Sequence, residues 1–389
     1  MSTKDYLYNV CYPKIKDVTL IGITGTNGKT TTCYLIYQIL NQIGVKTAYI
    51  GTIGFYYPGN KALLESTTPN MDLLYNLIIE AKDNGCKVVV MEVSSHALKQ
   101  DRVHGILFDA AGVTNVTKEH LDYHKTMEDY VSSKALLVEK LRGKRVAILN
   151  KHDKYYKRFI NRKNNNHIIG KDIKIKKVIY DKVNTIIKTN DGKFTLNMVG
   201  NFNVYNFLMA YEIVEKLGYD VKPFLNDATG LTEPPGRMQK VTYDSNVIFI
   251  DYAHTPDAVL NVLKTVNKLK NEGVITIIGC GGNRDKTKRP VMAKTACSNS
   301  DYVIFTSDNP RDEDEKQIID DMLEGAFGKY EVIYDRRLAI RKGISLLKEN
   351  MILMVLGKGH EDYQIIGTKK IHFCDYEEVM RELKDSSNL

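Results

Sequence analysis

The residue types that indicate chemistry most directly lie near the start of the chain, in LIGITGTNGKTTTCYLIYQIL, residues 20–40. A hydrophobic run leads into a glycine-rich turn with a lysine and hydroxyls, and then into an apolar helical pattern. This order is typical of a phosphate-binding loop at a helix N-terminus. Lys29 would approach the β and γ phosphates, the backbone N–H groups of Gly25 to Thr30 would surround them, and Thr30 would ligate Mg²⁺. Ile23 breaks the strict G-x-x-x-x-G-K-[ST] pattern, but the strand–loop–helix order still favours a nucleotide site.

Acidic residues and histidines follow later apolar runs. Glu92 ends the run VVVME. A carboxylate at the C-terminal end of a neighbouring parallel strand is well placed to organise Mg²⁺. Further on, four potential metal ligands lie within six positions, namely Glu119, His120, Asp122 and His124. Their spacing matches neither H-E-x-x-H nor a structural zinc pattern, so both a zinc site and an ordinary polar loop cluster are compatible with these residues.

Short apolar runs alternate with helical patterns almost throughout, which predicts an α/β fold with mainly parallel sheets. Before residue 200 the predicted strands are 17–24, 46–53, 87–93, 108–116 and 145–150, followed by a β-rich patch over 176–199 with a hairpin at NDG. A helix is predicted over 203–218. The two prolines and the glycine of TGLTEPPGRMQKV predict a boundary. Beyond it the predicted strands are 246–253, 274–281, 301–307, 331–335 and 351–357.

Bulk composition narrows the class of protein. The 389 residues contain no uninterrupted apolar run long enough to span a membrane, and the first residues lack the apolar core of a signal peptide, so we expect a cytoplasmic protein. The six scattered cysteines predict neither a disulfide framework nor a zinc site. Much of the net charge of +8 lies within residues 151–188. We interpret this segment as solvated lysines and not as a nucleic-acid site, because it lacks an aromatic–basic RNA-binding signature.

Ten short motifs together resemble the Mur ligases, and most closely the MurE type, which adds the third amino acid to the UDP-N-acetylmuramoyl dipeptide of peptidoglycan. The resemblance covers roughly residues 18–389. In chain order the motifs are GTNGKTT, MEVSSHAL, TNVTKEHLDYH, SSKALL, GNFNVYN, GRM, DYAHTPDA, GCGGNRDKTKRP, DNPR and GKGHEDYQ.

The resemblance implies a P-loop central domain that binds ATP and a C-terminal Rossmann-like domain, which close around the substrates. A carboxylate would attack the γ-phosphate of ATP to give an acyl phosphate, and an amine would then displace phosphate to form an amide. Mg²⁺ and cationic side chains must offset the repulsion between the anionic reactants. The implied ATP-binding residues are Gly25, Thr26, Asn27, Gly28, Lys29, Thr30, Thr31, Asn203, Asn206, Arg237, Asp251 and His254. Asn203 and Asn206 lie near a helix start, so a capping role is an equal reading from the residues alone.

Two Mg²⁺ sites are implied by the same resemblance. Thr30 and Glu92 would hold the first, and His120 would help to hold the second. Lys134 matches the lysine that family members carbamylate with CO₂, which replaces a repelled ammonium by an anion beside the metal. Arg237 would reach the γ-phosphate when the domains close. The implied catalytic residues are therefore Lys29, Glu92, His120, Lys134 and Arg237.

The amino-acid pocket is implied by residues of the C-terminal part. From the residues alone, SDNPRDEDE predicts a helix N-cap with acids in the first turn. In the family, however, DNPR accompanies meso-diaminopimelate, whose distal carboxylate the arginine binds bidentately. Members that add lysine lack this arginine. The implied contacts are Arg284, Asp308, Asn309, Arg311, Gly357 and Glu361, the last holding the distal ammonium.

Two features depart from the family pattern. Asn283 stands where members usually have Asp. Full-length members also carry a UDP-binding domain of about one hundred residues before the phosphate loop. Here we expect a short leader or linker over 1–19, a central domain over 20–235 and a C-terminal domain over 236–389. The acceptor-facing residues of the central domain are present, namely Thr67, Thr68, Ser94 and Arg102.

Three acceptor hypotheses follow. The enzyme uses UDP-N-acetylmuramoyl-L-alanyl-D-glutamate with its UDP unbound, a partner protein replaces the UDP-binding domain, or the acceptor is a smaller UDP-free acid, as in folylpolyglutamate synthases. The motifs VSSHAL, DNPR and GKGHEDYQ favour the MurE type over those synthases. A catalytically idle subunit is disfavoured because its expected losses, Lys29, Glu92, His120 and Lys134, are all present. We predict small-molecule substrates and neither a nucleic-acid nor a membrane partner.

Overall fold

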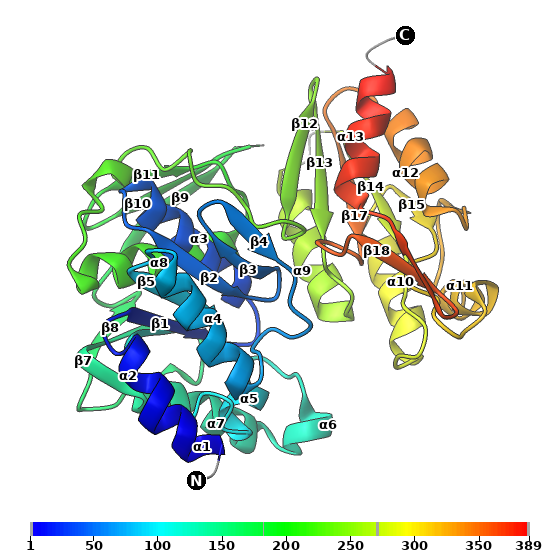
Figure 1. The fold of residues 1–389 in the computed structure, drawn as a ribbon. Coiled ribbons are helices and arrows are strands. Elements are labelled where there is room, and N and C mark those ends of the chain that lie inside the picture. Colours follow the sequence, from blue (N-terminus) through cyan, green and yellow to red (C-terminus); the bar gives the residue numbers. More distant parts are fainter. Residues whose placement is uncertain (1–2, 182, 270–271, 387–389) are drawn as a thin grey trace. The chain divides into compact units, whose positions relative to one another are not determined.

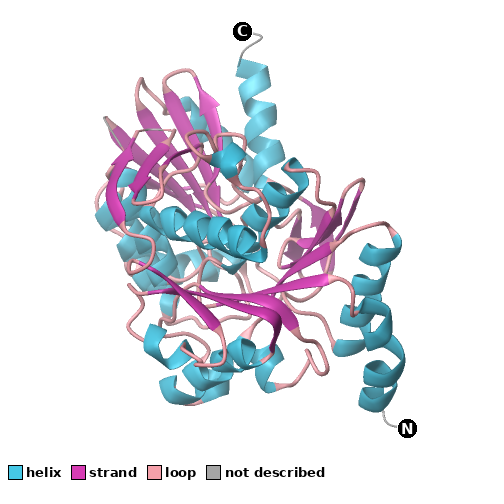
Figure 2. Cartoon of the chain, turned by 90° about the vertical axis from the view of Figure 1, so that its left-hand side faces the viewer, coloured by secondary structure: helices cyan, strands magenta, loops and turns pink. Residues whose placement is uncertain are grey.

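The computed structural model describes residues 3–181, 183–269 and 272–386, and the chain divides into two compact units (Figure 1). Unit 1 consists of Met1–Ile179 and Asn184–Thr232, and unit 2 consists of Tyr180–Val183 and Glu233–Leu389. Each unit has its own sheet with helices on both faces, as the strands and helices of Figure 2 show. The predicted α/β fold is therefore confirmed.

Unit 1 is organised around one eight-stranded sheet with the order β4-β3-β2-β5-β1-β6-β7-β8. All neighbours from β2 to β8 pair in parallel, whereas β3 and β4 are antiparallel additions at one edge. The strands are β1 (Thr19–Thr24), β2 (Thr47–Gly51), β3 (Gly54–Tyr57), β4 (Asn60–Ala62), β5 (Val88–Glu92), β6 (Phe108–Val113), β7 (Leu141–Asn150) and β8 (Asn165–Ile169). The sequence did not predict β3 and β4, since the short edge strand β4 is polar and exposed.

Alternating side chains divide the unit 1 core between the two faces of this sheet. Leu20 of β1 packs with α4, α5 and α7, whereas Ile21 and Ile23 pack with α3 and α8. A strand buried on both faces reads as a continuous apolar run, which is why β1 and β5 were predictable. The helices are α3 (Lys29–Gln42), α4 (Met71–Asp83), α5 (Ser95–Lys99), α6 (Leu121–His124), α7 (Met127–Glu139) and α8 (Asn201–Leu217), with 3₁₀ turns at Tyr156–Phe159 and Lys222–Phe224.

Two smaller parts complete unit 1. Before β1 the chain forms three short helical segments, α1 (Thr3–Tyr6), η1 (Leu7–Cys11) and α2 (Tyr12–Ile15), and Leu7, Cys11 and Ile15 are buried in the core. A three-stranded sheet contains β9 (Ile175–Tyr180), β10 (Thr185–Thr189) and β11 (Lys193–Leu196). Antiparallel pairing of β10 with β11 confirms the hairpin predicted at NDG.

Unit 2 has a six-stranded sheet with the order β12-β13-β17-β14-β15-β16, parallel except for β12 at one edge. Its strands are β12 (Gln239–Tyr243), β13 (Asn246–Asp251), β14 (Gly273–Ile278), β15 (Tyr302–Phe305), β16 (Tyr330–Val332) and β17 (Met351–Leu356). Its helices are α9 (Pro256–Asn267), α10 (Lys288–Asn299), α11 (Glu315–Leu323), α12 (Arg336–Ser345) and α13 (Asp375–Ser386). A hairpin of β18 (Tyr363–Ile366) and β19 (Lys369–His372) follows β17. In the part of the chain that the structure describes, no helix has the length and apolar content needed to cross a membrane.

Candidate active site

The phosphate loop of unit 1 joins β1 to α3, and its backbone conformation requires two of its glycines. Gly25 and Gly28 have φ angles of +148° and +87°, in the region that side chains rarely adopt. A Cβ atom at Gly25 would lie 1.8 Å from Oγ1 of Thr114, and one at Gly28 would lie 2.4 Å from Oδ1 of Asn206. Gly28 immediately precedes α3, so the first N–H groups of this helix lie at the loop. The loop thus offers backbone donors where a phosphate binds.

Lys29 and Thr30 occupy the first turn of α3. The Lys29 ammonium donates to the carbonyl oxygens of Gly25 and Thr26, at 2.9 Å in both cases, so it is folded over the loop. The Thr30 hydroxyl donates to Oε2 of Glu92 at 3.0 Å. Parallel pairing of β1 with β5 places Glu92 beside Ile23, at the end of the strand. A hydroxyl and a carboxylate in contact are hard oxygen ligands of the kind that Mg²⁺ prefers.

A residue that the sequence did not single out, Asn115, holds the tip of this loop. Its Oδ1 accepts the N–H of Asn27 at 3.0 Å, and its Nδ2 donates to the Asn27 carbonyl at 3.0 Å. Its own carbonyl accepts the N–H of Thr26 at 2.7 Å. The predicted strand over 108–116 ends at Val113 because Thr114 and Asn115 bond to the loop. Asn115 lies within the motif TNVTKEHLDYH, which was the only signal in the sequence.

Lys134 lies on α7 with only 1% of its surface exposed. Its ammonium donates to the Gly25 carbonyl at 2.8 Å and lies 4.4 Å from the centre of the Tyr130 ring. Burial, followed by the charge of Lys29, lowers the pKa of Lys134 well below its ordinary value. Tyr130 shares a hydrogen bond of 3.0 Å with the Thr26 hydroxyl. Lys134 is therefore a buried lysine directly beneath the phosphate loop.

The acidic and histidine cluster after β6 is not arranged as a zinc site. His120, with φ of +55°, is exposed and lies 3.6 Å from Glu119, whereas His124 is buried with its Nε2 3.0 Å from the Ser95 hydroxyl. Across residues 3–181, 183–269 and 272–386, no three His, Cys, Asp or Glu side chains are grouped to hold a metal ion. The cluster is a polar loop packed against α5 and α7.

The two asparagines at the start of α8 do not cap that helix, whose N-cap is Gly200 without a side-chain bond. Asn203 is buried and donates to the Val199 carbonyl at 2.8 Å. Asn206 donates to Oδ1 of Asn203 at 3.2 Å and accepts from the Thr32 hydroxyl at 3.5 Å. The capping alternative is therefore wrong: Asn206 lies beside Gly28 of the phosphate loop, and Asn203 bonds to Asn206. Thr31, the remaining predicted loop residue, is buried in the first turn of α3.

Three of the predicted acceptor residues meet at the end of β5. The Thr68 hydroxyl donates to the Glu92 carbonyl at 3.0 Å and accepts the N–H of Ser94 at 3.0 Å. Nη1 of Arg102 donates to the Thr68 carbonyl at 2.9 Å. Ser94 is the N-cap of α5 and accepts from Ala97. Thr67 is near this group, because its hydroxyl lies 3.0 Å from that of Thr52, which itself donates to Glu92.

In unit 2, the predicted nucleotide residues gather at the end of β13. The Arg237 guanidinium lies 4.7 Å from the centre of the Tyr252 ring, and its Nε is buried without a hydrogen-bond partner. Asp251 accepts the N–H groups of Met238 and Ala253 at 2.7 and 2.8 Å. Burial raises the pKa of Asp251, and the Arg237 charge opposes this effect. The third predicted residue here, His254, is exposed and bonds to the Tyr252 carbonyl at 2.8 Å.

Most of the predicted amino-acid residues of unit 2 lie on the loops after β15 and β17. Nδ2 of Asn309 donates to Oε2 of Glu361 at 2.8 Å. A fully buried lysine that the sequence did not predict, Lys358, donates to Oδ1 of Asn309 at 3.4 Å and to Glu361 at 3.5 Å. Arg311 donates through Nη1 to the Gly282 carbonyl at 2.8 Å, and its backbone N–H reaches the Ile365 carbonyl. Burial and then the Asp308 charge raise the pKa of Glu361, whereas Lys358 lowers it.

The remaining predicted residues differ in how closely they are held. Gly357 has φ of +113°, and a Cβ atom there would lie 2.5 Å from Oδ2 of Asp308. Arg284 is exposed on the loop after β14. On the same loop, Asn283 donates to Oδ2 of Asp312 at 2.8 Å. An amide therefore suits this position, where a carboxylate would face the Asp312 carboxylate.

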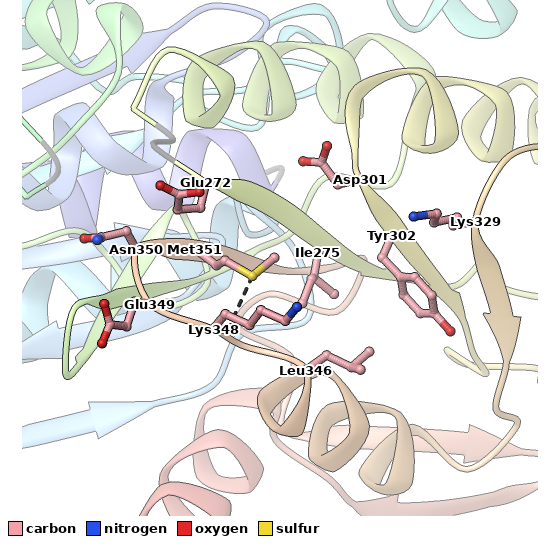
Figure 3. Close-up of a pocket in the computed structure, with 10 residues that line it drawn as sticks. All are labelled: Glu272, Ile275, Asp301, Tyr302, Lys329, Leu346, Lys348, Glu349, Asn350 and Met351. Carbon is pink, nitrogen blue, oxygen red and sulfur yellow. Dashed lines mark hydrogen bonds between the residues drawn. The ribbon is translucent and has the colours of Figure 1, made fainter.

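A surface pocket of about 680 Å³ in unit 2 lies away from these residues (Figure 3). It is lined by Glu272, Asp301, Lys329, Lys348 and Met351, among others. Glu272 and Asp301 precede β14 and β15, so the pocket opens at the N-terminal edge of the sheet. Ligands of parallel α/β sheets bind at the opposite edge, where the predicted residues lie.

Two family models match the chain. The Mur ligase middle domain matches residues 23–214, and the Mur ligase glutamate ligase domain matches residues 236–359. The first range contains the phosphate loop, Glu92 and Lys134, and the second contains Arg237, Asp308 and Arg311.

Individual proteins agree with these family matches. The UDP-N-acetylmuramoyl-L-alanyl-D-glutamate–2,6-diaminopimelate ligase of Aquifex aeolicus is 44% identical over 377 residues, which are 94% of this chain and 77% of that protein. A solved structure of a ligase with the same name is 32% identical, with a TM-score of 0.71 over 99% of this chain and 81% of that one. Folylpolyglutamate synthase of Thermotoga maritima shares the fold alone, with a TM-score of 0.71, 15% identity and coverage of 91% and 89%. The chain therefore belongs to the Mur ligase family, and within it to the MurE type.

Proposed function

We propose that this Mur ligase uses ATP to join meso-diaminopimelate to the D-glutamate carboxylate of UDP-N-acetylmuramoyl-L-alanyl-D-glutamate. The observation that carries the choice of amine is the pairing of two adjacent loops in unit 2. One loop presents Arg311 and the other presents Glu361, and Asn309 bonds to Glu361 across them. A cation and an anion on neighbouring loops suit an amino acid whose distal end carries both a carboxylate and an ammonium. The names of the relatives at 40–44% identity agree with this substrate pair.

The reaction proceeds in two steps. An oxygen of the acceptor carboxylate attacks the γ-phosphorus of ATP, and the bond to the bridging oxygen breaks to release ADP and leave an acyl phosphate. The amine nitrogen then attacks the acyl carbon, phosphate leaves, and the nitrogen loses a proton as the amide forms. Lys29 and the N–H groups at the start of α3 bind and orient the phosphates, and Arg237 supplies a further cation for the γ-phosphate.

Mg²⁺ fits the oxygen ligands of unit 1. Thr30 and Glu92 would hold one ion, and His120 is proposed to help hold a second near the acceptor. When bound, the ions offset the negative charge of the phosphates. Glu92 has no exposed surface, so it is already oriented within the protein. Thr68, Ser94 and Arg102 at the end of the same strand would orient the acceptor, with Thr67 beside them.

We further propose that Lys134 is carbamylated. Its lowered pKa favours the neutral amine, which is the form that attacks CO₂. A nitrogen–carbon bond forms and the nitrogen releases a proton to water, which leaves a carbamate anion. The carbamate nitrogen keeps one N–H, which is enough to preserve the bond to the Gly25 carbonyl. A buried amine beside the phosphate loop is thereby converted into an anion suited to a metal-containing site.

The test is phosphate release from ATP with diaminopimelate, combined with mass spectrometry of the product. UDP-N-acetylmuramoyl-L-alanyl-D-glutamate is compared with a UDP-free γ-D-glutamyl acceptor. We expect one diaminopimelate to be added per ATP cleaved, with a preference for the UDP-linked acceptor. A strong preference for the UDP-free acid would contradict the proposed acceptor. Turnover with lysine but not with diaminopimelate would contradict the proposed amine.

A further inference from the structure

Tyr49 on β2 contacts the site at a position that none of the motifs contains. Its side chain is fully buried, and its hydroxyl donates to Oε1 of Glu92 at 2.5 Å. The contact exists because β2 pairs in parallel with β5, its neighbour in the sheet. A phenol at this point touches the carboxylate to which we assign Mg²⁺ binding.

The two oxygens of Glu92 have different surroundings. Oε1 accepts from the Tyr49 hydroxyl and from the backbone N–H of Thr52, at 2.5 and 2.8 Å. Oε2 accepts from the hydroxyls of Thr30 and Thr52, at 3.0 and 3.2 Å. Backbone and a buried ring hold Oε1, whereas Oε2 faces the Thr30 hydroxyl at the start of α3. The carboxylate is thus held in one orientation.

The environment of Tyr49 keeps its hydroxyl at this oxygen. The ring centre of Tyr49 lies 5.6 Å from that of Tyr56 and 6.3 Å from that of Tyr34, in tilted and edge-on contacts. A Cβ atom at Gly51 would lie 2.3 Å from both Oε1 of Glu92 and the Tyr49 hydroxyl. Only glycine at position 51 therefore leaves room for the hydrogen bond between them. Ring packing, the absence of a side chain at Gly51 and the hydrogen bond all specify the same arrangement.

We infer that Tyr49 is a positioning residue: it fixes Oε1 of Glu92 so that Oε2, together with the Thr30 hydroxyl, faces the divalent cation that accompanies the nucleotide. The inference rests on the proposed function, in which Glu92 binds Mg²⁺. Partners that orient a metal ligand typically change metal affinity by about 10- to 100-fold when they are removed. Tyr49 touches neither substrate nor metal in this account.

The test is the affinity for ADP of Tyr49→Phe, measured calorimetrically in the presence and absence of Mg²⁺, together with Mn²⁺ binding followed by electron paramagnetic resonance. Phenylalanine keeps the ring and removes the hydroxyl. We expect unchanged ADP affinity without metal, and a metal-dependent increase in affinity that is about tenfold smaller than in the wild type. In turnover, the Mg²⁺ concentration at half-maximal rate should rise, with kcat largely restored at saturating Mg²⁺.

Tyr56→Phe is the matched control, because it removes a hydroxyl from the same ring cluster without touching Glu92, and its metal dependence should equal that of the wild type. Equal ADP affinity of Tyr49→Phe and wild type with metal, or equal losses with and without metal, would overturn the inference. If Tyr49→Phe does not fold, Gly51→Ala is the second variant: its Cβ would crowd both the Tyr49 hydroxyl and Oε1 of Glu92, so metal-dependent ADP affinity equal to that of the wild type would overturn the inference. ADP and metal binding are measured without acceptor or amine, so a failure of the proposed ligase reaction would leave this result readable on its own.

Discussion

Several predicted site residues of unit 1 are held in the core, whereas several of those in unit 2 lie on loops at the surface. Glu92 and Lys134 are essentially without exposed surface, and each bonds to the phosphate loop or to α3. In unit 2, the predicted amino-acid contact Arg284 is exposed, and Arg311 is half-buried. The difference separates two tasks: groups that act on phosphate are oriented by the core before any ligand binds. Groups that recognise the amine lie on loops, where a substitution changes the choice of substrate with less effect on folding.

The largest effect is expected at the buried lysine of unit 1. Lys134→Ala should lower kcat by about 10²- to 10³-fold, as removal of a charged group from a preorganised site does. Short carboxylates such as acetate should restore part of the activity, because they replace the carbamate anion. Lys140→Ala, just beyond the same helix, serves as the control and should retain activity. Full activity of Lys134→Ala without an additive would show that the reaction does not depend on the buried Lys134 side chain of unit 1.

The next largest effect is expected at the loop arginine of unit 2, and it should be selective. Arg311→Ala should lower kcat/KM for diaminopimelate by about 10- to 100-fold, the range for losing a hydrogen bond to a charged group. With lysine, which has no distal carboxylate, the change should be severalfold at most. The measurement is the ratio of kcat/KM for the two amines, with Lys316→Ala on the neighbouring helix as the control. Equal losses for both amines would argue against the arginine as a carboxylate contact.

Lys134 and Arg311 also show which parts of the site can be predicted from the sequence. The phosphate loop, most parallel strands and the separate β13–β17 sheet follow from apolar runs and turn residues, and Lys134 and Arg311 follow from family motifs. The contacts that orient these site residues do not follow from the sequence, because they depend on which strands are neighbours in the sheet. Tyr49 reaches Glu92 only because β2 lies beside β5, and a single sequence does not specify strand order.

Buried polar residues within loops were missed for a related reason. Lys358 stands inside the motif GKGHEDYQ, but no spacing rule indicates that its ammonium turns inward to Asn309 and Glu361. Asn115 likewise lies within a motif, TNVTKEHLDYH, that does not indicate its role. Capping at Asn203 and Asn206 was a reasonable reading of residue type, and it is wrong because the helix begins two residues before Asn203.

A smaller effect is expected from the buried lysine of unit 2. Lys358→Met should raise KM for diaminopimelate by about tenfold, because Asn309 and Glu361 lose a shared partner. Lys358 lowers the pKa of Glu361, so its removal raises that pKa further. Glu361 binds an ammonium only when ionised, so the acidic limb of the kcat/KM profile should move to higher pH. An unchanged acidic limb, with Lys316→Met as the control, would show that Lys358 does not act through Glu361.

The smallest effect is expected at an exposed loop position of unit 2. Asn283→Asp places a carboxylate against Asp312, in place of a hydrogen bond of 2.8 Å. Asp tolerates the left-handed backbone of this position, φ of +54°, nearly as well as Asn. The melting temperature should fall only slightly at pH 7, and the difference should become smaller at 1 M salt, where the repulsion between the two exposed carboxylates is screened. A decrease in melting temperature that salt does not change would mean that repulsion between the carboxylates at positions 283 and 312 is not its cause.

The division of tasks is tested most directly by trapping the acyl phosphate with hydroxylamine in the absence of amino acid. ATP, Mg²⁺ and UDP-N-acetylmuramoyl-L-alanyl-D-glutamate are supplied, and the acceptor hydroxamate is quantified for the wild type, Lys134→Ala and Arg311→Ala. The account predicts equal hydroxamate from the wild type and Arg311→Ala, and almost none from Lys134→Ala. Loss of hydroxamate in Arg311→Ala, or its retention in Lys134→Ala, would contradict the claim that Lys134 of unit 1 serves activation of the carboxylate and Arg311 of unit 2 serves selection of the amine.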